Sequence, residues 1–185
     1  RTILMKHIKV LILSLVISLL SLPSWGETMD DLVERGDLWY KKFTDVPFTG
    51  KITGQVQGKI KNGKEEGPWI WYWENGRLMK RGDYKNGKEE GPWVGYKDGE
   101  LWFKSDYKNG KQVGPYVSYY KNGSLYTKGM NKDNKPEGLW HTYYDNGQIS
   151  RTGYYENGKK EGKWLSYWDS GSVLEEGDYK NGKKE

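Results

Sequence analysis

The sequence of 185 residues contains no cysteine and only two histidines, His7 and His141. The lack of cysteine excludes disulfides, thiolate nucleophiles and cysteine-based metal sites. Other copies of the repeat described below carry an apolar residue at the position of His141, namely Ile70, Val94, Val117 and Leu165. We therefore expect a half-buried His141 that replaces an apolar side chain, with no catalytic or zinc-binding role.

Long apolar runs are also scarce, and the only one spans the 13 residues from Val10 to Leu22. It is shorter than the roughly 20 residues of an ordinary transmembrane helix. Basic residues precede it, and Ser24 and Gly26 are small residues at the spacing of a signal cleavage site. Residues 1–26 therefore resemble a secretory signal that is cut after Gly26, with an uncleaved anchor as the alternative. We expect an exported protein, periplasmic or secreted.

A strong excess of one charge is absent from the predicted mature chain. Removal of Arg1, Lys6 and Lys9 leaves 27 basic and 25 acidic residues. Lysine and glutamate alternate in the segments between apolar runs, which is typical of a solvated mixed surface rather than a polyanion-binding patch. Nucleic acid is therefore excluded as a partner, and attraction to an anionic membrane surface is weakly supported.

The dominant feature of the sequence is a segment of about 24 residues that recurs five times. The leading glycines of the copies are separated by 24, 23, 24 and 24 residues. We number the copies units 1 to 5 from these glycines: Gly67, Gly91, Gly114, Gly138 and Gly162. A fixed period of this size is typical of proteins in which each repeat packs only against its neighbours.

Each unit contains two turn signals, which are Asn75-Gly76 and Asn86-Gly87 in unit 1. Asn-Gly accepts the positive φ angles of a tight two-residue hairpin turn. The flanking runs are rich in Trp, Tyr, Ile and Val, which favour strands. The sequence therefore predicts an all-β fold, in which tandem β-hairpin repeats of about 24 residues form an elongated, single-layered antiparallel meander sheet.

The pairing of the strands can be predicted from the turns. A two-residue turn at Asn75-Gly76 places Trp69 opposite Gly82. The same arithmetic gives an aromatic residue opposite a glycine in units 3 to 5: Tyr116 with Gly129, Trp140 with Gly153, and Trp164 with Gly177. A cross-strand aromatic ring can cover a strand glycine, so we expect each ring to cover the glycine opposite it.

Unit 2 departs from this arithmetic because it is one residue short before Asp98-Gly99. A regular ladder would set Trp93 against Lys104 instead of Ser105. A one-residue slip turns every side chain to the wrong face. We therefore predict a β-bulge between Lys97 and Lys104.

The ends of the array differ from the five units. Within a leader of residues 27–47, the stretch from Thr28 to Tyr40 predicts a short helix that ends at Gly36. The repeat domain, residues 48–185, then begins with a shortened unit, because Gly50 and Gly67 are only 17 residues apart. We expect the helix and the shortened unit to cap the array. The last residues stop where another glycine–aromatic pair is due, and we expect a truncated C-terminus.

The pattern NGKxEGPW…YxENGxL…GxYKNGK, which runs from Phe48 to the last residue, resembles the MORN-repeat family. The resemblance is to the bacterial variant often labelled the YwqK-type antitoxin. It implies β-hairpins stacked into a single-layered sheet, and contact with a protein or a membrane rather than catalysis. The segment from Leu38 to Gly50 resembles the leader that precedes such repeats in exported bacterial members.

Aromatic residues are the remaining candidates for function. One column combines the leading glycines with Trp69, Trp93, Tyr116, Trp140 and Trp164, and we expect these residues to be structural. Exposed aromatic stripes, in contrast, mark binding surfaces. Trp71 is a candidate because the other units carry small residues at its position: Gly95, Ser118, Thr142 and Ser166. Trp73 and Trp102 complete the candidates for partner binding.

The leading hypothesis is an exported, non-enzymatic module of a bacterial envelope that binds another protein through its aromatic sheet face or an open strand edge. A cell-wall glycan bound by the same aromatic residues is the alternative, followed by a membrane surface. Antitoxin-like neutralisation of a partner is implied by the resemblance alone. The carboxylates alternate with lysines, so we expect no catalytic residue, cofactor or metal.

Overall fold

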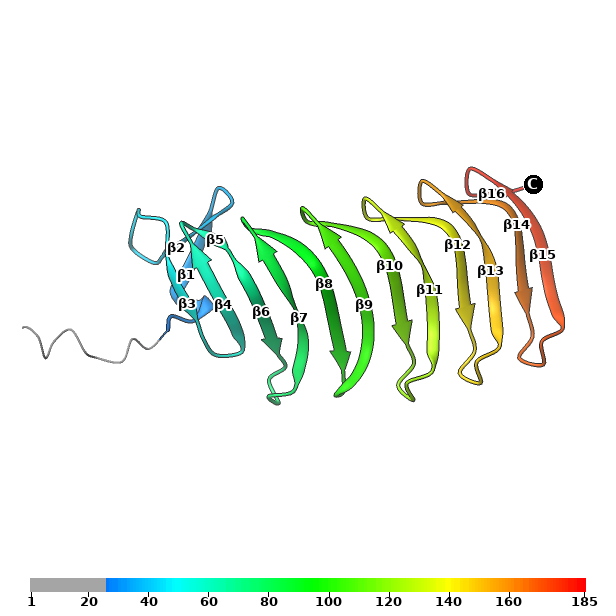
Figure 1. Cartoon of the computed structure of the whole chain (residues 1–185), viewed down its shortest axis with the longest axis horizontal. Coiled ribbons are helices and arrows are strands. Elements are labelled where there is room, and N and C mark those ends of the chain that lie inside the picture. The colour runs from blue at the N-terminus through cyan, green and yellow to red at the C-terminus, as the bar shows by residue number, and fades with distance from the viewer. Residues whose placement is uncertain (1–25) are drawn as a thin grey trace, which may run out of the picture.

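The computed structural model describes residues 26–185. The predicted signal segment lies outside the described residues, apart from Gly26. Figure 1 shows one row of β-hairpins that follow one another along the long axis of the molecule. Among residues 26–185, no helix is long and apolar enough to cross a membrane.

The repeat domain is one antiparallel sheet in which consecutive strands are neighbours. Its first strands are β3 (Gly50–Ile52), β4 (Val56–Lys61) and β5 (Lys64–Glu65). The strands of units 1 to 3 are β6 (Gly67–Tyr72), β7 (Leu78–Lys85), β8 (Lys88–Lys97), β9 (Glu100–Lys108), β10 (Lys111–Tyr119) and β11 (Leu125–Lys132). Those of units 4 and 5 are β12 (Lys135–Tyr143), β13 (Ile149–Glu156), β14 (Lys159–Tyr167), β15 (Val173–Lys180) and β16 (Lys183–Lys184).

This topology confirms the predicted all-β meander. The sheet contains 14 strands, and only β5 lies off the path that runs from β16 to β3. Every unit supplies one hairpin, and the hairpins of units 1 to 4 each pair with the next one. The repeat domain is therefore a single-layered sheet.

The two Asn-Gly signals of a unit form different turns, which corrects the prediction for the first of them. Both Asn86 and Gly87 have positive φ, at 52° and 78°, as a two-residue primed turn requires. At the first signal only Gly76 has positive φ. Trp73 N–H there donates to Arg77 O across a longer loop. Trp73 therefore lies in the loop rather than in a ladder.

A β-bulge follows this longer loop and restores the register. Tyr72 pairs with Leu78 while Trp71 pairs with Lys80, so Met79 has no partner in the ladder. Units 3, 4 and 5 have the same shift, at Tyr119 with Leu125, Tyr143 with Ile149 and Tyr167 with Val173. The predicted aromatic–glycine pairs, Trp69 with Gly82 among them, are confirmed.

The bulge predicted for unit 2 is also confirmed. Trp93 pairs with Ser105, while Tyr96 pairs with Leu101, so Trp102 is the extra residue. The other units contain a bulge at the same place, so the bulge itself is not special to unit 2. Its distinction is the first turn of the unit: Asp98 and Gly99 have φ angles of 56° and 94° and form a tight two-residue turn where the other units have a longer loop.

The predicted helix between Thr28 and Tyr40 is wrong. A single 3₁₀ turn, η2 (Met29–Asp31), precedes a hairpin of β1 (Leu32–Arg35) and β2 (Leu38–Lys41). The physical reason lies in Gly36 and Asp37, whose φ angles of 56° and 59° form a primed two-residue turn. The glycine that was expected to end a helix therefore reverses a strand.

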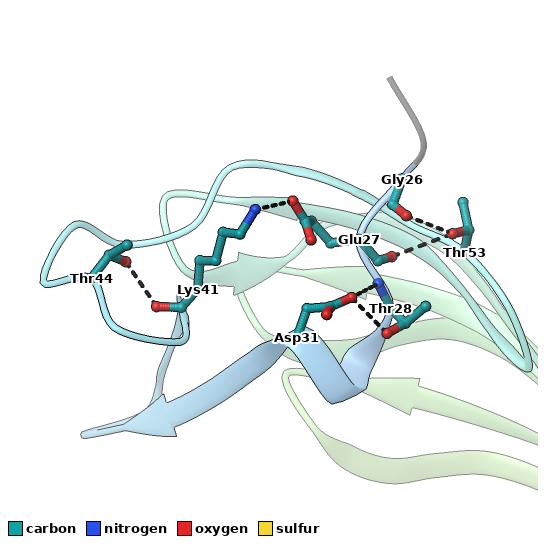
Figure 2. A network of polar contacts seen from close by, with 7 residues as sticks. All are labelled: Gly26, Glu27, Thr28, Asp31, Lys41, Thr44 and Thr53. Carbon is teal, nitrogen blue, oxygen red and sulfur yellow. Dashed lines mark hydrogen bonds and ion pairs between the residues drawn. The ribbon is translucent and has the colours of Figure 1, made fainter. Parts of the chain in front are cut away.

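The expected N-terminal cap is present, although it is built from this hairpin. Leu32 packs with Ile52, Ile60 and Trp69 in a cluster that covers the first strands of the sheet. Figure 2 shows the polar contacts beside it, where Thr28 N–H and Oγ1 both donate to the Asp31 carboxylate. These contacts, together with the buried cluster, close the start of the array.

Candidate functional site

An aromatic row runs along one face of the sheet and contributes Trp69, Trp93 and Trp164 to its core. The row consists of Trp69, Trp71, Tyr84, Trp93, Phe103, Tyr107, Tyr116, Trp140, Tyr155, Trp164 and Tyr179. Ring centroids of neighbours in contact lie 4.9 to 6.5 Å apart. Aromatic pairs at such distances stabilise by about 0.5–1.5 kcal/mol beyond their buried area.

Four of the five tryptophans in the row lie over glycines of the preceding strand. The glycines beneath Trp69, Trp93, Trp140 and Trp164 are Gly58, Gly82, Gly129 and Gly153, respectively. This corrects the expectation that each ring covers the glycine paired with it in its own hairpin. The leading glycines of the five units explain this shift in packing. Their φ angles are positive, at 65° to 74°, and form a bulge at each junction between units. Each bulge directs the following tryptophan back over the strand before it.

The aromatic residues that were expected to be structural all lie in this row. Trp69, Trp93 and Trp164 are buried, at 2%, 3% and 7% exposure. Trp71 also belongs to this packing, since it stacks on Trp69 and tilts against Trp93, with centroid distances of 5.8 and 5.5 Å. Lys80 Nζ lies over the Trp71 ring, 4.4 Å from its centroid. Trp71 is therefore half-buried and packs within the row.

Trp73 and Trp102, the other two candidates, are exposed by 39% and 51%. Trp73 lies in the loop between β6 and β7, apart from the aromatic row. Trp102 occupies the bulge of unit 2 and contacts Phe103 edge-on, at 5.5 Å between ring centroids. Of the three candidates, Trp102 lines a recess between neighbouring units.

This recess lies between the turns of units 2 and 3 and has a volume of about 330 Å³. Leu101, Trp102, Tyr119, Tyr120 and Tyr126 form its walls. Its rim is charged, and Lys121 pairs there with Asp98 at 3.7 Å. We call it the Trp102 recess.

The short turn of unit 2 explains why the recess is open. The residue after the tyrosine of the first strand is Tyr120 in unit 3 and Tyr144 in unit 4. Their hydroxyls donate to the backbone oxygens of Tyr143 and Tyr167 in the following units, at 2.7 Å. Unit 2 carries Lys97 at this position, so no tyrosine spans the space between units 2 and 3.

Tyr120 and Tyr126 were not among the candidates, because the recess forms between units and a single repeat does not reveal it. Their rings meet edge-on at 5.0 Å, and Tyr126 remains 43% exposed. Burial, followed by the influence of Tyr126, raises the pKa of the Tyr120 phenol above its ordinary value. The phenol is therefore neutral at physiological pH and acts as a hydrogen-bonding group. The one-residue deletion in unit 2 was the sequence feature that could have indicated a recess beside Tyr120 and Tyr126.

Four segments of the chain match the family model described as MORN repeat variant: residues 65–86, 112–130, 136–157 and 160–181. These segments coincide with units 1, 3, 4 and 5. The chain belongs to the MORN-repeat family. Trp102 and the short turn of unit 2 lie outside the matched segments. MORN repeats are generally non-catalytic modules.

No curated protein matches the sequence of this MORN-repeat chain. Among solved structures, a crystal structure of a GtfA/B complex bound to UDP and GlcNAc is similar to 77% of the chain, at 15% identity and a TM-score of 0.20. The MORN-repeat chain spans only 27% of the length of that protein. A likeness of this size carries no functional information.

Two titratable residues of the MORN repeats, His141 and Glu66, make contacts that support the sheet. His141 is half-buried as expected, and its Nδ1 lies 3.0 Å from Thr152 Oγ1. Burial, followed by Lys128, lowers the pKa of His141. Glu66 accepts a hydrogen bond from the Asn86 backbone N–H of the next turn, at 2.9 Å. Within residues 26–185, no group of three or more His, Asp or Glu side chains is arranged to hold a metal ion.

Proposed function

We propose that this MORN-repeat protein is an exported, non-enzymatic module that binds a protein partner through the Trp102 recess. The occupant is an apolar or aromatic anchor side chain on an extended segment of the partner. The observation that carries the proposal is the exposure of Trp102, 51%, at the wall of a 330 Å³ recess. The rings of the aromatic row, in contrast, pack against one another.

The chemistry of the recess resembles the centre of a protein interface. Binding hot spots are enriched in tryptophan and tyrosine, placed in pockets surrounded by a polar rim. Trp102 and Tyr126 supply such rings, and Leu101 supplies an aliphatic wall. The rim carries Lys121 and Asp98, which are already paired and leave little net charge to attract an ionic ligand.

The proposed export is compatible with the N-terminal cap. Thr53 N–H donates to Glu27 O, and Glu27 forms a parallel bridge with Ile52. A cut after Gly26 would retain both contacts. The mature chain would then begin at a residue that the cap already holds.

Peptide selection with the folded chain tests the proposal. A phage-displayed library of unstructured peptides is selected on residues 27–185, and the affinity of the selected peptides is measured by titration calorimetry. We expect peptides with one large apolar or aromatic anchor, and a loss of about tenfold or more in affinity with Trp102→Ala. Trp168→Ala is the matched control, because Trp168 is 53% exposed in the loop of unit 5, away from the recess.

Circular dichroism of both variants checks that the sheet is retained. Absence of selected peptides, or equal affinities of the parent and Trp102→Ala, overturns the proposal. Photo-crosslinking in cells from Tyr126, replaced by a photoreactive phenylalanine, then identifies the natural partner. An adduct that Trp102→Ala abolishes supports the protein-binding function, and a toxin in that adduct would establish an antitoxin-like role.

A further inference from the structure

Unit 3 interrupts the aromatic row on the sheet. The second strand of the other units contributes a tyrosine to the row: Tyr84, Tyr107, Tyr155 and Tyr179. Unit 3 carries Asn131 at that position. Asn131 is itself only 9% exposed, so an amide replaces a phenol ring inside the row.

The shorter side chain uncovers part of the neighbouring tryptophan. Trp93 is covered edge-on by Tyr84 of the preceding strand, and Trp164 by Tyr155, with centroid distances of 5.3 and 4.9 Å. Trp140 is the equivalent ring beside Asn131. It alone among the four row tryptophans that lie over glycines is partly exposed rather than buried.

Amide groups gather around the uncovered ring. Asn131 Nδ2 donates to Gln112 Oε1 at 3.2 Å, and Gln112 Nε2 donates to the Tyr107 hydroxyl at 3.0 Å. Asn134 Oδ1 accepts from the backbone N–H of Gln112 at 2.6 Å. Gln112 stands where units 1 and 2 have Glu65 and Glu89, so the substitution also removes a negative charge.

These residues line an open cavity of about 320 Å³, at the lower end of the range of small-molecule sites. Tyr116, Trp140 and Tyr155 provide aromatic walls, and Gln112, Asn131 and Asn134 provide amides. None of the lining residues carries a charge. Tyr116 stacks on Trp140 at an interplanar angle of 29°, so the two rings form a continuous aromatic surface.

We propose that this cavity, the Asn131 site, binds a neutral carbohydrate. One face of a pyranose ring presents C–H groups that can pack on an aromatic ring, while hydroxyl groups around its edge require donors and acceptors. An amide supplies both, since its oxygen accepts two hydrogen bonds and its NH₂ group donates two. An aromatic wall with neutral amides therefore fits a sugar better than a charged ligand.

The amide groups that have no hydrogen-bond partner also favour a carbohydrate ligand. Among residues 26–185, Asn131 Oδ1 has no hydrogen-bond partner, and the same is true of the Asn134 side-chain nitrogen. Satisfying these groups with a ligand adds contacts without breaking those that position Gln112. The site thus offers one acceptor and one donor beside the exposed part of Trp140.

This inference goes beyond the proposed function, because the Asn131 site shares no lining residue with the Trp102 recess. A chain with both sites could hold a protein partner while it is attached to a glycan. The two proposals can fail separately, since the Trp102 variants leave the Asn131 site unchanged.

Two binding assays on residues 27–185 test the inference. Saturation-transfer NMR and calorimetry use soluble triacetylchitotriose, cellotriose and maltotriose as probes. Co-sedimentation uses insoluble peptidoglycan sacculi, and so distinguishes a polymeric source of the sugar from a soluble one. Each assay compares the parent with Asn131→Tyr, which restores the tyrosine of the other units and fills the cavity without removing an aromatic wall.

Met130→Asp is the matched control. It restores the aspartate that units 1, 2 and 5 carry at this position, as Asp83 does in unit 1, and strand alternation places it on the opposite face from Asn131. We expect the parent and the control to bind at least one probe, and Asn131→Tyr to bind it about tenfold more weakly or not at all. Thermal unfolding verifies that both variants fold.

Binding of sacculi alone, lost in Asn131→Tyr, supports the inference with cell-wall glycan as the source. Binding of a trisaccharide with the same loss supports a site for soluble sugars. The inference is overturned if the parent binds none of the probes. It is equally overturned if Asn131→Tyr binds them as well as the parent does.

Discussion

The indole ring of Trp93 lies directly over Gly82 of the preceding strand, where a Cβ atom would be only 2.1 Å from the ring. Real Cβ atoms do not approach other heavy atoms so closely, so the ring and any larger residue cannot share this space. Glycine is thus required at this position by the packing between units. The contact links one unit to the next and is therefore part of the cohesion of the array.

Gly82→Ala should consequently destabilise the sheet, although alanine normally suits a strand better than glycine does. Overpacking of this kind costs about 1–3 kcal/mol, and urea unfolding followed by tryptophan fluorescence measures it. Gly177→Ala is the control, because the nearest atom there is the flexible end of Lys184, at 2.7 Å. We expect the control to change the free energy of unfolding by less than about 0.5 kcal/mol. Equal losses in the two variants would contradict the packing role of Trp93.

Trp71 and Trp73 are two residues apart but should respond differently to truncation. Trp71 contacts Trp69, Tyr84 and Trp93 within the row. Trp71→Ala should therefore lower the free energy of unfolding by about 2 kcal/mol, which is less than the loss expected for a fully buried tryptophan.

Trp73→Ala provides the comparison, since its side chain is exposed in the loop. We expect its effect to remain within about 0.5 kcal/mol. Chemical denaturation of both variants is the measurement. If Trp71→Ala is as stable as the parent and loses peptide binding, the aromatic face rather than the Trp102 recess is the binding surface.

The glutamate before the leading glycine connects neighbouring turns. Glu66, Glu90, Glu137 and Glu161 accept from the backbone N–H of Asn86, Asn109, Asn157 and Asn181, respectively, at 2.8 to 2.9 Å. Glu66→Ala should cost about 1 kcal/mol, the usual net contribution of one hydrogen bond. Glu74→Ala removes an equally negative, exposed side chain from the loop of unit 1 and serves as the control in the same urea titration. A loss as large in the control would attribute the effect to charge alone.

The sequence predicted the strands well because the period repeats the same local signals in every unit. It predicted the opposition of Trp69 and Gly82 correctly, yet the glycine that Trp69 covers is Gly58. Counting residues from a turn gives the pairing inside a hairpin. The packing between hairpins depends on the bulge at the leading glycine, and a count within one unit does not include it.

The leader and the candidate site show the limits of local reasoning more clearly. A glycine such as Gly36 suits both the end of a helix and a tight hairpin turn, so its presence does not distinguish the two. Contacts of the hairpin with the rest of the cap favour the turn. Trp102 was recognised as unusual within its own unit. Tyr126 was not, because its contribution to the recess depends on the shorter turn of the unit before it.

His141 provides a prediction about pH. Burial and the cationic Lys128 opposite it disfavour the imidazolium, so the folded protein holds the pKa of His141 below the ordinary value of 6.5. The unfolded chain therefore binds more protons below pH 6.5. The contribution of His141 to stability is complete above that pH and is lost as the pH falls through the folded pKa.

His141→Val introduces the residue that units 2 and 3 carry at this position, as Val94 and Val117, and removes the titration. The free energies of unfolding of the parent and the variant, measured in urea at pH 8 and pH 5.5, should diverge at the lower pH in favour of valine. The carboxylates titrate in both proteins and cancel in the comparison, which isolates the histidine. A difference that is the same at both pH values would show that the imidazole titrates as it does in water, and that its half-buried position has no electrostatic consequence.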